Sequence, residues 1–367
     1  MEDKYVVSRD IVIFVDNGKI VLDNYANREQ RALKYKYINL LFNFIEPNTV
    51  ERAIELNSDL SSDEAMIVVG QLIEDGILIN DVQKIDKYSI ESLVPAARYF
   101  YHFMRNDGDT RYEGNVDSML SMAHRVEEFP SNHKSYKKSK KIINLTTDDT
   151  VDFDFYQRLL NRSSIRNTND VPITKNELSN ILYYSLGATG RTILDSLGSV
   201  PFRTAPTPGG RASIEAYIVT QNSDIDQGLY HYNYFENKLE LMKFGDFQEI
   251  IDKISGNQLH IKSSSVYILF TARMDSLIWK YPSPESLISP YVELGSIVQS
   301  QYLIAHKLGI GSVIVGSARH KTAEKLLEIN PNKEAYLAMM SMGHVAKENR
   351  FDRRDIDILK EEYFNEQ

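Results

Sequence analysis

The sequence contains no cysteine, one tryptophan and no apolar run that approaches the length of a membrane span. Without cysteine there is no disulfide framework, no thiolate metal site and no cysteine nucleophile. A transmembrane helix needs about 20 mainly apolar residues, and the N-terminus lacks the basic and then apolar layout of a signal peptide. We therefore expect a cytoplasmic protein that makes no membrane contact.

Positive charge and clustered histidine are also scarce. The 367 residues carry 42 Lys and Arg against 51 Asp and Glu, which gives a net charge of −9. Nucleic-acid affinity depends on Lys and Arg contacts to phosphates, so we expect no nucleic-acid partner and interpret the basic run over 134–141 as a solvated linker. The eight His residues never fall at the short spacings of zinc-binding helices, which predicts no metal site.

The chain does have an ordinary globular composition, 42% hydrophobic and 25% charged, over a length that indicates two domains.

In residues 1–90, two β-rich runs flank Asn17-Gly18, a strong hairpin signal, and three helical stretches and a short strand follow. This order predicts a winged-helix-like module. Its third helix carries four acidic residues, which DNA phosphates would repel. We expect peptide binding along an exposed strand edge, with a purely structural cap as the alternative.

The remainder of the chain is interpreted as an arm and a second domain. Residues 91–150 combine one helical stretch with segments rich in Gly, Asn, Ser and Pro, which favours a linker arm. Residues 151–367 alternate helices and strands, with a predicted hairpin over 228–243 and a long amphipathic helix from about 291 to 309. This pattern predicts an α+β sandwich.

Most familiar cofactor and nucleophile motifs are missing from the second domain. The glycines of "LGIGSVIVG" follow a helix and enter a strand, the reverse of a Rossmann fingerprint, and "GATGRT" has no P-loop Lys. No nucleophile elbow is recognisable. In "RSSIR", however, Arg162, Ser164 and Arg166 alternate, so in an extended turn their side chains point the same way. Two guanidiniums and a hydroxyl suit a phosphate that carries a polyol tail.

The order of "RSSIR", "PTPGG", "GLYHY", "WKY" and "LGIG" within residues 100–345 resembles the FMN-dependent nitroreductase-like enzymes, and among them the SagB-type azoline dehydrogenases of thiazole and oxazole peptide biosynthesis. The N-terminal module is similar to the PqqD-like leader-peptide recognition domains fused to several of them. The resemblance implies a homodimeric FMN flavoprotein with a nitroreductase-like α+β sandwich, which oxidises azolines to azoles on a ribosomal precursor peptide. It also implies a cyclodehydratase or synthetase complex as partner.

The same resemblance implies roles for individual residues. The catalytic pair falls on Lys280 and Tyr281, and the family's Glu-x-Gly-x-x-x-Gln helix is matched by Glu293, Gly295 and Gln299. The cofactor-binding residues come from the "RSSIR" segment, the "PTPGG" loop and three later regions. They are Arg162, Ser163, Ser164, Arg166, Pro206, Thr207, Pro208, Gly209, Gly210, Gln299, Gly316, Ser317 and Arg350.

For Lys280, the resemblance implies a base that accepts a proton from the azoline ring while FMN accepts a hydride. A Lys acts as a base near neutral pH only where burial keeps part of it uncharged. The apolar run before Lys280, "SLIW", is expected to supply a desolvating wall. The alternative is a charged surface Lys beside an ordinary Tyr, at the end of an amphipathic strand.

The sequence departs from the family pattern close to this pair. Residues 282–291, "PSPESLISPY", contain no Arg where the family carries an Arg-rich stretch, and Ser296 and Ser300 replace the family's His and Asn. Three functions therefore stay open. The first is azoline oxidation, and the second is flavin-dependent reduction of a dehydroamino acid, a nitro compound or a quinone. The third is a catalytically idle flavin-binding subunit that scaffolds a peptide-modifying complex.

Overall fold

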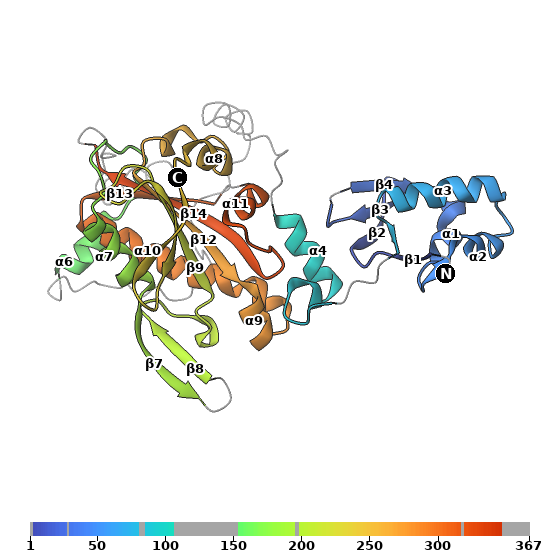
Figure 1. Ribbon diagram of the computed structural model, residues 1–367, viewed down its shortest axis with the longest axis horizontal. Helices are drawn as coiled ribbons and strands as arrows, with labels where there is room; N and C mark the ends of the chain where they lie inside the picture. The colour runs from blue at the N-terminus through green and yellow to red at the C-terminus, as the bar shows by residue number, and fades with distance from the viewer. Residues whose placement is uncertain are drawn as a thin grey trace, which may run out of the picture. The chain divides into compact units, whose positions relative to one another are not determined.

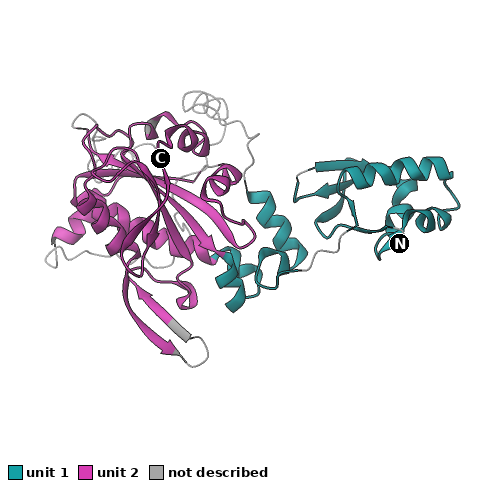
Figure 2. Cartoon of the chain, viewed as in Figure 1, with its two compact units in different colours: residues 1–106, 274–288 teal, residues 107–273, 289–367 magenta. Residues whose placement is uncertain are grey.

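The computed structural model of the protein describes residues 3–27, 29–80, 85–105, 153–194, 198–316 and 319–346. The chain forms two compact units (Figure 2), one of residues 1–106 with 274–288 and one of residues 107–273 with 289–367. The segment 274–288 is thus grouped with the first unit, although the residues on either side of it belong to the second. Most of the expected arm, residues 91–150, falls outside the described ranges, so the expected domain boundaries stay predictions.

The first unit contains two small antiparallel sheets. The first consists of β2 (Ile11–Asp16), β3 (Lys19–Asn24) and β4 (Glu29–Leu33), and the second of β5 (Asn48–Thr49), β1 (Lys4–Val7) and β6 (Leu78–Ile79). The predicted hairpin joins β2 to β3: Asn17 and Gly18 have φ angles of 47° and 74°, as a two-residue turn requires. In the described chain β4 pairs only with β3, so one edge of β4 is open.

Short helices pack against these sheets. They are α1 (Ile38–Phe42), α2 (Val50–Glu55), α3 (Ser62–Glu74) and α4 (Pro95–Met104), with the 3₁₀ turns η1 (Tyr35–Tyr37) and η2 (Ile90–Ser92). The three helices predicted within residues 1–90 are therefore present. α3 begins after Ser61, whose hydroxyl accepts a hydrogen bond from the Glu64 N–H. Leu40, Phe44 and Leu72 are fully or almost fully buried and form part of this unit's core.

The segment that carries Lys280 is a helix, α9 (Met274–Lys280), followed by the 3₁₀ turn η5 (Pro284–Leu287). The alternative interpretation of this segment as a strand end is therefore wrong. The Tyr281 N–H still donates to the Leu277 carbonyl at 2.7 Å, and Pro282, which lacks an N–H, ends the helical hydrogen bonding.

The second unit is built on a six-stranded antiparallel sheet (Figure 1). Its strands, in spatial order, are β11 (Lys238–Phe244), β10 (Gly228–Asn233), β9 (Ile214–Thr220), β12 (Val266–Arg273), β14 (Glu334–His344) and β13 (Ile310–Val315). The predicted hairpin over 228–243 is β10–β11, with a bulge between Leu229 and Tyr230. The central strands β9 and β12 are buried along nearly their whole length, as expected for strands that are covered on both faces.

Helices cover this sheet. They are α6 (Phe153–Asn161), α7 (Lys175–Leu186), α8 (Gln248–Ile254), α10 (Ser289–Lys307) and α11 (His320–Leu327), with the 3₁₀ turns η3 (Pro208–Gly210) and η4 (Leu259–Ile261). α8 and α11 contribute to one core cluster with alternate residues of β9 and β12. α10 lies beside α7 and contacts β9 and β13. α7 starts with a complete capping box between Thr174 and Glu177, which satisfies backbone N–H groups at the start of the helix.

A separate two-stranded hairpin, β7 (Ala188–Leu194) and β8 (Gly198–Arg203), extends from the six-stranded sheet within the same unit (Figure 1). This hairpin was not predicted, because Gly190 interrupts its first strand and Pro201 lies in its second. Its second strand leads directly into the "PTPGG" loop.

Candidate functional site

The "RSSIR" segment lies against β13, an edge strand of the six-stranded sheet. It follows α6, and the Ile165 N–H donates a hydrogen bond to the Ser312 carbonyl of β13 at 3.0 Å. Gly311 permits this approach, because a Cβ atom on it would lie 2.7 Å from Ile165 Cγ2. The backbone of the segment is therefore fixed to β13.

Tyr302 of α10 brings two of the predicted phosphate-binding residues together. The Arg162 guanidinium lies over the Tyr302 ring, with Cζ 5.1 Å from the ring centroid. The Tyr302 hydroxyl oxygen is 3.1 Å from Ser164 Oγ and accepts a hydrogen bond from the Ile314 N–H of β13 at 3.0 Å. Tyr302 is only 6% exposed, so packing restrains its ring.

The other two predicted residues of the segment differ in exposure. Ser163 is half-buried and Arg166 is exposed. Arg166 makes no ion pair with any carboxylate of the described ranges. Two cationic groups and a hydroxyl thus occur within five residues beside β13, which is a donor set suited to a phosphate.

The predicted flavin loop, residues 206–210, contains the 3₁₀ turn η3. Gly209 and Gly210 have φ angles of 56° and 66°, a backbone region that glycine adopts without strain. A Cβ atom on Gly210 would lie 2.6 Å from Val200 Cγ1 of β8. Glycine at this position therefore serves both the turn and its packing against the β7–β8 hairpin.

The two ends of this loop are held by one buried carboxylate from α10. Glu293 accepts hydrogen bonds from the Ser213 hydroxyl at 2.6 Å and the Ser213 N–H at 3.3 Å. Its Oε1 is 3.7 Å from Nη1 of Arg203, which precedes the loop, and both side chains are almost fully buried. The Arg203 guanidinium also stacks on the Tyr234 ring, with Cζ 3.5 Å from the centroid. Burial raises the pKa of Glu293, although Ser213 and Arg203 act in the opposite direction.

The remaining predicted cofactor residues show no such network. Gln299 is exposed on α10, and Gly316 is exposed directly after β13. Ser317 and Arg350 lie outside the described residues. The neighbouring Gln301, not predicted, is the buried glutamine of α10, and its Nε2 donates to Ser185 Oγ at 3.1 Å.

The predicted catalytic pair lies in the first unit, at the end of α9. Lys280 is partly exposed rather than buried, and its Nζ is 5.5 Å from the Tyr281 ring centroid. The expected desolvating wall is incomplete: the helix buries Leu277 and Ile278, whereas Trp279 is 41% exposed. The helical period of 3.6 residues explains this, because Trp279 points away from the face that its two predecessors bury.

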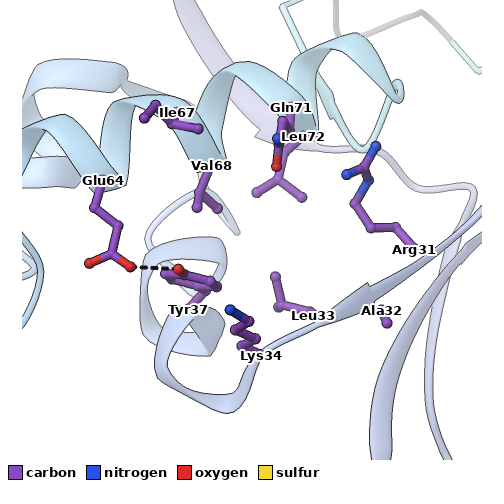
Figure 3. A pocket seen from close by; sticks show the side chains of 10 residues that line it. All are labelled: Arg31, Ala32, Leu33, Lys34, Tyr37, Glu64, Ile67, Val68, Gln71 and Leu72. Atoms are coloured by element: carbon purple, nitrogen blue, oxygen red, sulfur yellow. Dashed lines mark hydrogen bonds between the residues drawn. The ribbon is translucent and has the colours of Figure 1, made fainter.

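The first unit has a groove of about 420 Å³ between the open edge of β4 and helix α3 (Figure 3). Its floor is mainly apolar, with Leu33 from β4 and Val68 and Leu72 from α3, and Ile67 on its rim is 64% exposed. At one end the Tyr37 hydroxyl donates to Glu64 at 2.6 Å. A strand edge beside an apolar groove is the arrangement that β-strand addition requires.

His231, in the predicted "GLYHYN" strand, lies between two carboxylates of neighbouring strands. Its Nδ1 is 2.9 Å from Glu240 and its Nε2 is 3.2 Å from Glu215. Hydrogen bonds to Glu215 and then Glu240 raise the pKa of His231 to about 9, in spite of burial. This cluster therefore carries an imidazolium at neutral pH.

The described residues form neither a metal-binding cluster nor a membrane-spanning helix. Within the described ranges no three His, Asp or Glu side chains are grouped so that they could hold a metal ion. The helices that the structure describes are all too short or too polar to cross a bilayer.

Sequence reasoning missed Tyr302 and Arg203, which organise the two predicted cofactor segments. Both residues are nearly buried in the structure. Their residue types gave no signal, since a Tyr in a long amphipathic helix is normally a core residue and an Arg before a loop is normally a surface residue. Only the spatial contact between α10 and these segments reveals their roles.

The profile of the Nitroreductase family matches residues 159–344. The trifolitoxin-processing protein TfxB of Rhizobium leguminosarum bv. trifolii is 25% identical over 320 residues, which cover 80% of this chain and 84% of TfxB. MJ1384 of Methanocaldococcus jannaschii, which bears a provisional nitroreductase name, is 26% identical over 186 residues, covering 50% of this chain and 88% of MJ1384. A chain of the E. coli microcin synthetase McbBCD complex with truncated pro-MccB17 bound is similar at a TM-score of 0.49 and 15% identity, covering 65% of this chain and 85% of that one. Because the family profile spans more than half of the sequence, the chain belongs to the nitroreductase family.

Proposed function

We propose that the chain is an FMN-dependent dehydrogenase that oxidises azolines to azoles within a peptide-modifying complex. The observation that carries this proposal is the convergence of Arg162 and Ser164 on Tyr302, close in sequence to the exposed Arg166. Two guanidiniums and a hydroxyl match the charge and the oxygen atoms of a phosphate ester. Membership of the nitroreductase family supports a flavin as the bearer of that phosphate.

The two predicted cofactor segments border the same helix. Tyr302 contacts the "RSSIR" segment, and Glu293 binds the exit of the "PTPGG" loop. These two residues are nine positions apart on α10, which corresponds to about 14 Å along a helix axis. That separation suits an elongated ligand with a phosphate at one end and a ring system at the other.

When bound, FMN supplies a two-electron acceptor for the hydride that leaves the azoline ring. The chain must accept the proton from the other ring carbon, and we assign this role to Lys280, with Tyr281 beside it as a relay. Loss of one hydride and one proton converts the azoline into the aromatic azole. The partly exposed position of Lys280 leaves it accessible to a peptide. The bound peptide must then supply the burial that keeps part of Lys280 uncharged.

The N-terminal module is assigned to recognition of the precursor's leader, in the manner of a PqqD-like domain. The open edge of β4 provides unpaired backbone groups, and the adjacent apolar groove provides a place for side chains. The acidic residues of α3, including Asp63 and Glu64, argue against a DNA-binding role. Similarity to TfxB over 80% of the chain supports a peptide as the partner.

We also assign a homodimer and a cyclodehydratase or synthetase partner. α10 carries an exposed row that starts with Tyr291 and Val292, which are 46% and 69% exposed, and continues through Gly295 and Gln299. Large apolar groups in such a row are typical of a helix that pairs with a second copy. The molar mass in solution, measured by light scattering, tests the dimer.

The second candidate is a flavin-dependent reductase of dehydroamino acids, nitro compounds or quinones, or an idle flavin-binding scaffold. The feature that favours it is the absence of Arg from residues 282–291 after Tyr281. Turnover separates these functions, because only the dehydrogenase forms azoles from an azoline peptide.

Flavin content tests the cofactor assignment directly. Purified full-length protein should be yellow and should release FMN on denaturation. Protein that is colourless and stays unoccupied with excess FMN contradicts the proposal.

A further inference from the structure

Tyr302 links three parts of the second unit at one point. Its ring lies under the Arg162 guanidinium at 5.1 Å, and its hydroxyl lies between Ser164 Oγ at 3.1 Å and the Ile314 backbone nitrogen at 3.0 Å. The residue sits on α10, whereas its contacts come from the "RSSIR" segment and from β13. A phenol with neighbours on both its ring and its oxygen can therefore set the geometry of the segment.

The Tyr302 hydroxyl takes part in two hydrogen bonds, one with a backbone N–H and one with a second hydroxyl. The Ile314 N–H can only donate, so the phenol oxygen is its acceptor. The phenol has one hydrogen of its own, and Ser164 Oγ is the partner within reach of it. With Tyr302 as the donor of this bond, the Ser164 hydroxyl hydrogen is left to point to another acceptor.

A chain of hydrogen bonds of this kind strengthens its last donor. Each bond in the row from Ile314 through Tyr302 to Ser164 polarises the next one, which makes the Ser164 hydroxyl a better donor. The Arg162 guanidinium is held over the ring by a cation–π contact. Both groups are then arranged before an anion arrives.

We infer that Tyr302 is a positioning residue for the phosphate site: it directs the Ser164 hydroxyl outward as a donor and holds the Arg162 guanidinium in place. This inference rests on the proposed FMN function. It concerns only the phosphate end of that ligand, because Tyr302 contacts the "RSSIR" segment and β13. The ordinary alternative is that Tyr302 is a core aromatic that merely fills space between α10 and β13.

A positioning residue of the phosphate site and a core aromatic differ in whether their effect on binding depends on the phosphate of the ligand. Riboflavin has the ring system and ribityl chain of FMN but lacks the phosphate. The ratio of the riboflavin Kd to the FMN Kd therefore isolates what the phosphate contributes. A variant that only loosens packing weakens both ligands alike and leaves this ratio unchanged.

The experiment titrates full-length apoprotein with FMN and with riboflavin, followed by quenching of flavin fluorescence. In Tyr302→Phe, which keeps the ring, we expect FMN affinity to fall about three- to tenfold with little change for riboflavin, as the loss of one oriented hydrogen bond predicts. In Tyr302→Leu the ratio of the riboflavin Kd to the FMN Kd should fall further, because the aromatic ring under Arg162 is also lost. In a Ser164→Ala background, Tyr302→Phe should have no further effect, because the bonded pair is already broken.

Tyr267→Phe is the matched control. Tyr267 is a buried tyrosine of β12 in the same unit, and its hydroxyl donates to the Ile261 carbonyl at 2.7 Å. This variant should leave the ratio unchanged. An unchanged ratio in Tyr302→Phe, or equal losses for both ligands, overturns the role of Tyr302 while the flavin function stands. A wild-type protein that binds neither flavin overturns both.

Discussion

At the scale of single residues, His231 carries a charge that depends on its place in the fold. Its pKa is raised to about 9 by hydrogen bonds to Glu215 and Glu240, whereas an unfolded His titrates near 6.5. Protonation is thus favoured in the folded state. The stability it contributes is complete below about pH 6.5, declines as the pH rises, and is lost above about pH 9.

Because the pKa of His231 is higher in the folded state, the stability that His231 contributes should fall as the pH rises. His231→Gln should lower the thermal midpoint relative to the wild type at pH 6, and the difference should shrink steadily up to pH 9.5. Thermal unfolding in a series of buffers at constant ionic strength measures it. A difference that does not change with pH would show that the imidazolium makes no net contribution.

Arg166 differs from Arg162 in its surroundings, and this difference predicts a separable effect. Arg166 is exposed, so Arg166→Ala should leave the thermal midpoint unchanged. It should weaken FMN binding by about 10- to 100-fold, because hydrogen bonds to a charged group contribute roughly 1.5–3 kcal/mol. Arg191→Ala, at an exposed arginine of β7 in the same unit, is the control and should bind FMN normally. If Arg166→Ala and Arg191→Ala bound FMN with equal affinity, Arg166 would not be part of the FMN site.

At the scale of secondary-structure elements, the Glu293–Arg203 pair joins α10 to both ends of the "PTPGG" loop. Both side chains are almost fully buried, and Nε and Nη2 of Arg203 have no hydrogen-bond partner among the described residues. Removal of one partner from such a pair leaves a charge without compensation.

Glu293→Ala should therefore destabilise the protein by about 3–5 kcal/mol, measured by urea unfolding. The double variant Glu293→Leu with Arg203→Met should recover part of this loss, because it removes both charges. A double variant less stable than Glu293→Ala alone would show that the loop, and not the ion pair, is the main source of stability.

The groove between β4 and α3 allows an equally local test of peptide recognition. Ile67 lines the groove and is 64% exposed, whereas Met66, its neighbour on α3, is 50% exposed and does not line it. Ile67→Glu should weaken binding of the unmodified leader at least about tenfold, since it places a charge beside an apolar contact. Met66→Glu should not. Fluorescence anisotropy with a labelled leader peptide measures both affinities. Equal affinities for the two variants would show that the peptide does not bind in this groove.

The elements predicted from the sequence are those with local signals. Asn17-Gly18 predicts the β2–β3 turn, and alternating residues predict β10–β11. β7–β8 has no such signal. It packs against the loop that follows it, where Val200 lies beside Gly210.

The residues of the candidate site divide in the same way, into those with a local sequence signal and those without one. Arg162, Ser164 and the "PTPGG" glycines could be named from residue order, because their chemistry is encoded within a few positions. Tyr302 could not, because its contacts join residues 138 positions apart in the sequence. The burial expected of Lys280 was wrong for a related reason: an apolar run predicts burial only after the period of its helix is known, and α9 turns Trp279 outward.

At the scale of the whole molecule, the chain combines a nitroreductase-family unit with a small unit that has an open strand edge and a groove. The proposed residues divide between them. The phosphate-binding set belongs to the second unit, and Lys280 with Tyr281 is grouped with the first. Azoline oxidation as proposed therefore requires residues of both units, so its test uses the full-length protein.

The central claim is that the protein oxidises an azoline with FMN as the acceptor and Lys280 as the base. The most direct test mixes FMN-loaded full-length protein with an azoline peptide in the absence of oxygen. It follows the loss of oxidised-flavin absorbance together with azole formation by mass spectrometry. We predict one azole for each flavin reduced, and for Lys280→Ala an unchanged flavin content with a rate lowered by about 10²–10⁴. No flavin reduction by the wild type, or a Lys280→Ala variant that reacts at the full rate, would contradict the account.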